Sequence, residues 1–298
     1  MNRHAGLIFA LITVACWGVW GAFAGLPADH GFPETLIYVV WAFTMIPPCL
    51  YALAHVGWRW EHDPRSVLLG CLIGFTGAGG QMLLFHALHL GPTYLVFPLV
   101  ALSPLVTIAL SVGWLHERVT RIGALGIILA LLALPLFDYV PGEGFSGHGV
   151  AWFACSLVVL VAWGVQAFCI KLANRTMSAE SIFLYMTLTG LALIPVALAM
   201  TDFSRPINLG LGGPGLAAVT QILNAVGALT LVNAFRHGKA IVVSPLANAG
   251  APLVTALLSL ALLGIVPQAH KLLGISLAFV AAALLALEPE DPGEGASA

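Results

Sequence analysis

Charged residues are scarce in this sequence of 298 residues: only 8% are Asp, Glu, Lys or Arg, whereas 60% are hydrophobic. Soluble domains carry about 25% charged residues, because their surface has to be hydrated. The mean hydropathy of +0.98 points the same way. The shortage of charge therefore excludes a soluble globular protein and predicts a chain that lies in a lipid bilayer.

Several chemical signatures are also missing. The formal net charge is −2 and no basic stripe occurs, so nucleic acid is not expected as a partner. None of the five cysteines forms a Cys-x-x-Cys pair, which argues against a disulfide framework or a metal site. Neither His-Glu-x-x-His nor Gly-x-Ser-x-Gly is present. We expect no metal, no cofactor and no enzymatic activity.

Long uncharged stretches fill most of the chain. There are nine of them, and the third, residues 66–116, is too long for one crossing of about 20 residues. Gly91-Pro92 divides it near the middle, which gives ten spans. Residues 127–136 are apolar at every position, unlike the alternating strands of a membrane barrel. The sequence predicts an all-α integral membrane protein with ten transmembrane helices.

The few basic residues predict the topology. With a cytoplasmic N-terminus, nine of the eleven Lys and Arg fall in cytoplasmic loops, and only Arg205 and Lys271 lie outside. Cytoplasmic loops are enriched in basic residues, so this orientation is favoured. An even number of helices then places both termini in the cytoplasm. We expect a multi-pass protein of the cell inner (plasma) membrane.

The second half of the chain repeats the first. A shift of about 147 residues superposes tryptophan, glycine and proline positions. The matched pairs are Trp17 with Trp163, Gly80 with Gly227, Pro98 with Pro245, and Pro104 with Pro252. Five helices per copy is an odd number, so the copies enter the membrane from opposite sides, which is typical of secondary transporters. We predict two inverted five-helix repeats, residues 1–140 and 150–287, with a linker at 141–149 and an acidic cytoplasmic tail at 288–298.

These motifs resemble a known family. A Trp-Gly pair early in the first helix of each repeat, a Gly turn before the fourth helix, paired prolines in that helix and a Gly-Glu-Arg-like end are similar to the ten-helix permeases of the drug/metabolite transporter (DMT) superfamily, built from two EamA-type repeats. The corresponding residues are Trp17-Gly18, Gly91-Pro92, Pro98, Pro104, Glu117-Arg118, Trp163-Gly164, Gly238, Pro245 and Pro252. The chain departs from the pattern at His116, where a Gly is usual, and at 264–267, where the second copy has no acid. The resemblance implies metabolite transport, more in line with export, through a central cavity lined mainly by helices 1, 3, 4, 6, 8 and 9.

Buried polar and aromatic residues are the candidates for substrate binding, because unpaired polar groups in hydrocarbon are costly and turn inward. They are Trp17, Trp20, Gln81, His86, Tyr94, Trp163, Gln166, Asn224, Asn233, Ser244 and Asn248. Interhelical hydrogen bonding or packing is the alternative for each of them. Pro98, Pro104, Pro245 and Pro252 are candidate hinges because an interior proline kinks a helix, although proline is in any case common in membrane helices.

The acids avoid the span interiors: Glu34 and Glu180 begin spans and Glu117 ends one. This disfavours exchange of lipophilic cations for protons, which uses a carboxylate within the membrane. We expect a secondary transporter of a small neutral or zwitterionic metabolite, such as an amino acid, working by alternating access as an exporter. An importer of a vitamin, nucleobase or sugar-like solute and an intramembrane enzyme acting on a lipid-borne substrate are the alternatives. A coupling proton, for which His86 is a candidate, and a homodimer are further hypotheses.

Overall fold

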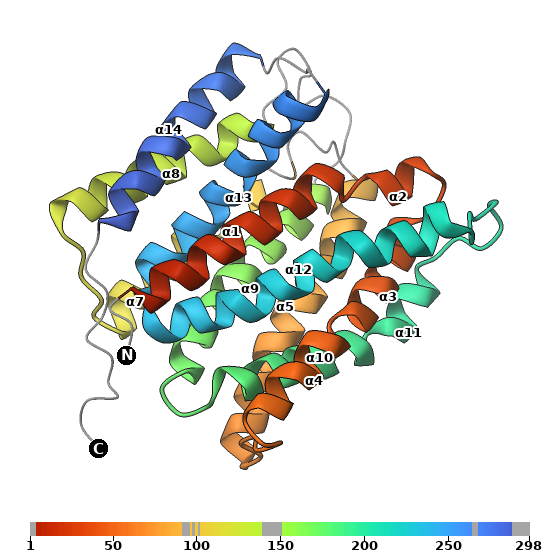
Figure 1. Ribbon diagram of the computed structural model, residues 1–298, viewed down its shortest axis with the longest axis horizontal. Helices are drawn as coiled ribbons and strands as arrows, with labels where there is room; N and C mark the ends of the chain where they lie inside the picture. Colours follow the sequence, from red (N-terminus) through yellow and green to blue (C-terminus); the bar gives the residue numbers. More distant parts are fainter. Residues whose placement is uncertain are drawn as a thin grey trace.

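The computed structural model describes residues 4–90, 96, 99–100, 102–138, 151–263 and 268–287, and every regular element among them is a helix (Figure 1). In chain order the helices are α1 (Ala5–Phe23), α2 (Leu26–Asp29), α3 (Glu34–Thr44), α4 (Ile46–His55), α5 (Pro64–Leu90), α7 (Pro104–Trp114), α8 (Arg121–Asp138), α9 (Ala151–Ala173), α10 (Ala179–Ala192), α11 (Ile194–Ala199), the π-helical turn η1 (Leu211–Gly215), α12 (Leu216–His237), α13 (Ala240–Leu263) and α14 (Ala269–Ala286).

Several of these helices join into single spans. Within the described ranges, six segments are long and apolar enough to cross a membrane: α1 with α2, α3 with α4, α5, α9, α10 with α11, and η1 with α12. Four shorter apolar helices, α7, α8, α13 and α14, complete the bundle. The prediction of an all-helical membrane protein of about ten helices is confirmed.

Prolines interrupt the second span of each half at matching places. Pro47 lies in the first turn of α4, directly after α3 ends, and Pro195 lies in the first turn of α11, directly after α10 ends. A proline has no N–H to continue the preceding helix, so a break just before it is tolerated. The same local chemistry therefore shapes both halves of the chain.

Contacts between helix termini define the two ends of the bundle. Lys171, in the last turn of α9, donates a hydrogen bond from Nζ to the carbonyl oxygen of Gly238 after α12 (2.7 Å). Gly6, at the start of α1, packs against the same Gly238. The carboxylate of Glu117, just after α7, accepts a hydrogen bond from the N–H of Ala240, where α13 begins (3.0 Å). We call this end of the bundle the basic end, because it contains Lys171, Arg236 and Lys239. The far end of the bundle is called the opposite end.

Corresponding helices of the two halves run in opposite directions. α1 begins at the basic end, whereas its repeat counterpart α9 ends there. The loop before α5 also lies at this end, since the Glu61 carboxylate accepts a hydrogen bond from the Ser178 hydroxyl (2.9 Å), whereas α12, the counterpart of α5, ends there. This is the inverted arrangement that the charge pattern predicts. Gly126 of α8 packs on Leu285 of α14, so the last described helix also returns to the basic end.

The two halves exchange their first helices. α1 packs mainly against α12 and α13 of the second half, and α9 packs mainly against α5 and also against α7 of the first (Figure 1). A glycine allows the close approach of α1 to α13: a Cβ on Gly18 would collide with the side chain of Val254. The hydroxyl of Thr255 donates to the carbonyl oxygen of Gly18 (2.8 Å). Small residues at helix contacts are typical of membrane bundles.

The α9 contact repeats this geometry residue for residue. A Cβ on Gly164 would collide with the side chain of Val106, and the Thr107 hydroxyl donates to the carbonyl oxygen of Gly164 (3.1 Å). The bundle therefore contains two interlocked groups of helices. We call α1, α12 and α13 the first group, and α5, α7 and α9 the second group.

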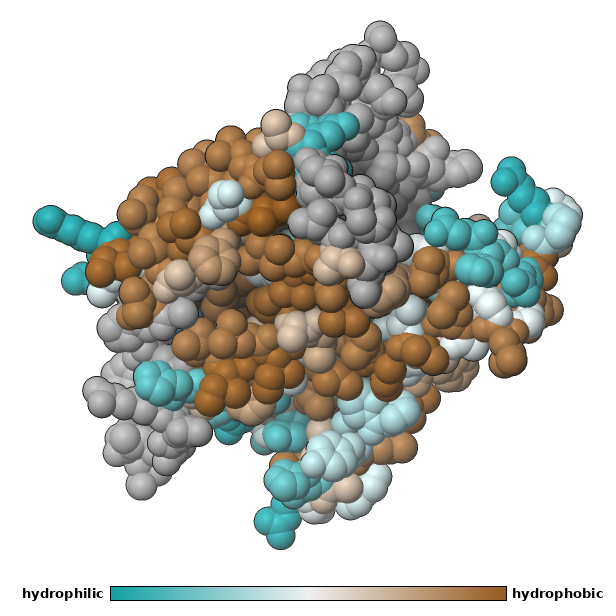
Figure 2. Space-filling model, turned by 45° about the horizontal axis from the view of Figure 1, so that its top comes forward, coloured by the Kyte–Doolittle hydropathy of each residue, from teal (hydrophilic) through white to brown (hydrophobic). Residues whose placement is uncertain are grey.

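The exterior is apolar around the middle. Figure 2 shows hydrophobic side chains as a broad belt on the visible face, with hydrophilic residues gathered toward its ends. Leu68, Val219 and Phe279 are each about two-thirds exposed or more. Exposed apolar surface of this extent has to be covered by another apolar phase, which for a multi-pass protein is lipid.

Candidate functional site

Two adjoining cavities occupy the centre of the bundle, with volumes of about 270 and 510 Å³. They share lining residues from α1, α3, α5, α9, α12 and α13. The shared residues are Trp17, Trp20, Trp41, Gln81, Trp163, Asn224 and Asn248. Both halves of the chain thus contribute to one central site, near the middle of the membrane spans, where secondary transporters bind their substrates.

The cavities extend toward different ends. The larger one reaches Ala24, Gly25 and Glu34, which lie at the opposite end of the bundle. The smaller one reaches toward the basic end and stops at Ile170 and Phe235, whose side chains are each 1% exposed. Beyond them lies the contact between Lys171 and Gly238 described above. The described part of the site is therefore closed at its basic end.

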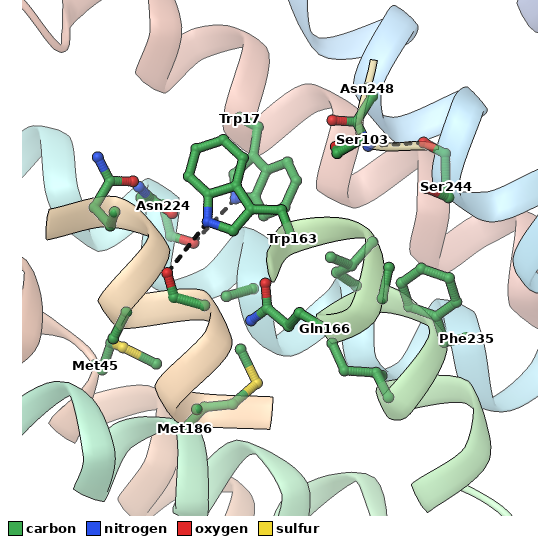
Figure 3. Close-up of a pocket in the computed structure, with 18 of the residues that line it drawn as sticks. Trp17, Met45, Ser103, Trp163, Gln166, Met186, Asn224, Phe235, Ser244 and Asn248 are labelled. Carbon is green, nitrogen blue, oxygen red and sulfur yellow. Dashed lines mark hydrogen bonds between the residues drawn. The ribbon is translucent and has the colours of Figure 1, made fainter. Parts of the chain in front are cut away.

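Two indoles stand at the centre of the site in equivalent positions (Figure 3). The Trp17 Nε1 donates to the carbonyl oxygen of Asn224, and the Trp163 Nε1 donates to that of Gly77, both at 3.2 Å. Gly77 and Asn224 are related by the same shift that relates the two halves. Each ring is fixed by its hydrogen bond to the opposite half, so the indole faces present a rigid wall to a solute.

Amide side chains supply the polar part of the lining. The Asn248 Nδ2 donates to the Ser244 carbonyl oxygen (2.9 Å), which fixes the direction in which its amide points. Gln81 and Gln166 line the smaller cavity, and their side-chain amides form no hydrogen bond with the described residues. Since an amide carries both donors and an acceptor, these two are available to polar groups of a solute.

The lining carries little charge. Among the described lining residues, Glu34 is the only acidic or basic one, and it is exposed at the mouth of the larger cavity. Elsewhere the polar groups are amides, hydroxyls and indole N–H groups. A solute with a large net charge would lose its hydration there without a countercharge.

Most predicted site residues lie together. Eight of the eleven line a cavity: Trp17, Trp20, Gln81, Trp163, Gln166, Asn224, Ser244 and Asn248. His86 lines neither of these two cavities; it is exposed, one turn before α5 ends. Asn233 does not either, and its amide donates to the Leu229 carbonyl oxygen of its own helix (3.0 Å). Tyr94 lies outside the described residues. A role in binding stays a prediction for all of them.

The candidate hinges differ from one another. Pro245 and Pro252 lie inside α13, and Pro252 also lines the larger cavity. Pro104 is the first residue of α7 and therefore begins a helix, while Pro98 lies outside the described residues. Hinge motion at these residues stays a prediction.

Some lining residues were missed from the sequence. Trp41, Met45 and Met186 line the smaller cavity, and Tyr38 lines the larger. Trp41 carries the signal that indicated Trp17, an indole inside a span, and could have been found in the same way. The methionines could not, because an apolar side chain in a membrane span gives no indication of which way it faces.

A duplicated, inverted, all-helical membrane bundle around a midplane cavity is the architecture of a secondary transporter. The EamA-like transporter family model matches residues 4–137 and again residues 150–287. The chain belongs to the EamA-like transporter family.

Similarity to individual proteins is more limited. A solved crystal structure superposes with a TM-score of 0.80 and covers 95% of this chain and 96% of its own, at 18% sequence identity, which shows a shared fold. The uncharacterized protein MJ1333.1 of Methanocaldococcus jannaschii is 37% identical over 59 residues. That match spans 20% of this chain and 43% of the relative.

Proposed function

We propose that this protein is a secondary transporter that carries a small neutral or zwitterionic metabolite, such as an amino acid, across the inner membrane by alternating access. Its family indicates a membrane transporter of the DMT type. The observation that supports the substrate class is the lining of the central cavity, which offers amides, hydroxyls and indoles, with Glu34 at the mouth as the one acidic or basic residue among the described lining residues.

The proposed direction of transport is export. Both termini would lie in the cytoplasm, and the basic end of the bundle would face the cytoplasm. The support is the distribution of basic residues, since Lys and Arg are retained on the cytoplasmic side. The larger cavity would then extend toward the outer face. The two halves, residues 1–140 and 150–287, would act as the inverted units of the transport cycle.

Flux into liposomes tests this proposal. Purified protein is reconstituted and offered labelled amino acids, nucleobases, vitamins and sugars, with and without a pH gradient. Saturable flux of a neutral or zwitterionic solute is expected, and its dependence on the gradient tests proton coupling. Preference for nucleobases, vitamins or sugars, with inward flux, would favour the importer. If no solute moves while lipid is turned over, the proposal is wrong and the enzyme alternative holds.

Substitutions in the cavity test the site. Gln166→Leu and Asn248→Leu remove polar groups that face the cavity, so the KM for flux should rise about tenfold, as expected when a hydrogen bond to the solute is lost. Gln268→Leu is the matched control, because Gln268 is exposed just before α14, away from the cavity lining. Unchanged KM in both cavity variants would show that the site has been misplaced.

A further inference from the structure

Three polar contacts join the two groups of helices at the basic end. The first is the hydrogen bond from Lys171 Nζ, on α9 of the second group, to the Gly238 carbonyl oxygen, next to α12 and α13 of the first group (2.7 Å). The second is made three residues further along the chain, where the Asn174 Nδ2 donates to the Val232 carbonyl oxygen of α12 (3.0 Å). Both cross the boundary between the groups beneath the floor of the cavity.

The third contact involves a carboxylate. Glu117, just after α7 of the second group, accepts hydrogen bonds from the N–H groups of Ala240 and Ile241 at the start of α13 (3.0 Å each). A carboxylate at this place pairs with N–H groups that lack helical partners and with the positive end of the helix dipole. His116 before it adopts a φ of 55°, a left-handed conformation that favours glycine and that turns the chain toward α13.

Because Lys171 is buried, its hydrogen bond to Gly238 is costly to break. Lys171 is only 8% exposed, so the hydrogen bond of its amino group to Gly238 replaces lost hydration. Gly6 packs against the same Gly238 so closely that a Cβ there would lie 2.7 Å from the Gly238 nitrogen. Separating the two groups of helices at this end would therefore break the hydrogen bond of a buried amino group and open a tightly packed contact.

The opposite end has no such residues at the equivalent sequence positions. With the shifts that align Trp17 with Trp163 and Pro104 with Pro252, Lys171 corresponds to Gly25 and Glu117 corresponds to Ile265. Asn174 corresponds to Ala28. None of these three can make the same polar contact. The contacts of Gly18 and Trp17 recur at Gly164 and Trp163, whereas those of Lys171 and Glu117 have no such counterpart in sequence.

We propose that Lys171 and Glu117 are gating residues of the transport cycle, which hold the basic end closed and make the state open toward the opposite end the resting state. The proposal rests on the transport function proposed above. In an ideal inverted repeat, the two open states would be related by symmetry and equal in free energy. The contacts of Lys171 and Glu117, which the repeat-related residues Gly25 and Ile265 cannot make with their side chains, shift that balance, and they have to break once in every cycle.

Side-specific labelling tests this without any substrate. A cysteine at Ser244, which lines the cavity floor, is introduced into a chain whose five native cysteines are replaced, and a membrane-impermeant maleimide is added to either side of the membrane. Lys171→Met and Glu117→Gln should speed labelling from the basic side about 10- to 100-fold, the factor expected for a hydrogen bond made by a charged group, and slow it from the other side.

Matched controls separate gating from general loosening. Lys271→Met removes a lysine at the start of α14, and Glu180→Gln removes a carboxylate from the first turn of α10; both should leave labelling unchanged. Lys171→Arg keeps a charged donor and should restore slow labelling from the basic side. If Lys171→Met does not fold, the isosteric Glu117→Gln tests the same closure. Labelling of the Lys171 and Glu117 variants that stays equal to that of the controls, on both sides, would overturn the proposal.

Labelling and flux together distinguish failure of the gate from failure of the proposed transport function. A shift in labelling without flux of any solute would support the gate and contradict transport of the tested classes. Saturable flux without a shift in labelling would support transport and contradict the gate.

Discussion

The indole of Trp163 lies directly on the backbone of Gly80, so that a Cβ at Gly80 would be 2.6 Å from the indole nitrogen. The repeat-related pair, Trp17 on Gly227, has the same arrangement. Each tryptophan comes from one half and each glycine from the other. The two contacts hold the central indoles at the middle of the bundle and link the site to the packing of the two halves.

Gly80→Ala should destabilise the protein by about 1–3 kcal/mol, because the added methyl group forces a rigid ring out of a packed position. Gly79→Ala is the neighbouring control: its nearest contact would be Phe75 at 3.9 Å, and alanine favours helix by up to about 1 kcal/mol. Thermal unfolding in detergent measures both. A Gly80 variant as stable as the Gly79 variant would contradict the packing described.

Gly77→Ala should alter transport more than stability. A Cβ at Gly77 would collide with the amide end of Gln166, which is flexible and can move, whereas the Trp163 ring cannot. Since Gln166 lines the cavity, its displacement should change the KM for the solute while leaving the unfolding temperature close to that of the parent protein. Flux and unfolding are measured on one preparation, and a loss of stability as large as that of Gly80→Ala would refute the distinction.

Thr107→Val and Thr255→Val remove the equivalent hydroxyl contacts with the carbonyl oxygens of Gly164 and Gly18. Each should cost about 0.6 kcal/mol, the average for interhelical hydrogen bonds in membranes. Thr76→Val is the control, because the Thr76 hydroxyl donates to carbonyl oxygens of its own helix. Chemical unfolding in mixed micelles resolves differences of this size when the three variants are compared, and equal effects in all three would count against an interhelical role.

Glu61 should make stability depend on pH at the acidic end of the range. Burial opposes its ionisation, but hydrogen bonds from Ser181 and Ser178 outweigh this and lower the pKa of the carboxyl group below its ordinary value of 4.5. A lowered pKa stabilises the folded state above pH 4.5, and this contribution is lost as the pH falls through the lower value.

Unfolding temperatures measured across this range test the effect. Glu61→Gln should lower the unfolding temperature at pH 7 by more than it does at the acidic end, where the carboxyl group of the parent protein is protonated. Asp29→Asn serves as a control at the other side of the bundle. A difference between Glu61→Gln and the parent protein that stays constant with pH would disprove the assignment.

The sequence was sufficient to predict the class of fold, the spans and the duplication, because these follow from where charges, glycines and prolines occur. It also led to eight of the cavity residues, since a polar or indole side chain inside a span has few places to turn other than inward. His86 and Asn233 satisfied the same criterion but lie away from the cavity lining. A polar side chain in a span can hydrogen-bond to its own helix, as Asn233 does, or lie exposed near a helix end, as His86 does. The sequence of one span does not distinguish these cases from a side chain that lines the cavity.

The contacts of Lys171 and Glu117 that close the basic end could not be predicted from the sequence, for another reason. Glu117 and Lys171 look in sequence like residues that end helices at the membrane surface, where such charges are ordinary. Their partners include backbone groups of Gly238, Ala240 and Ile241, which no side-chain pattern marks. Only the approach of the helix ends in space brings these groups together.

The exchange of first helices has a consequence for assembly. Because α1 completes its packing on the second half and α9 completes its packing on the first, neither half can bury its own grooves before the other is made. When the first five spans have been synthesised, the surfaces of α1, α5 and α7 that pack on the second half are still without their partners, until α9, α12 and α13 are inserted. Because each half completes its packing on the other, we expect the two halves to fold and unfold together.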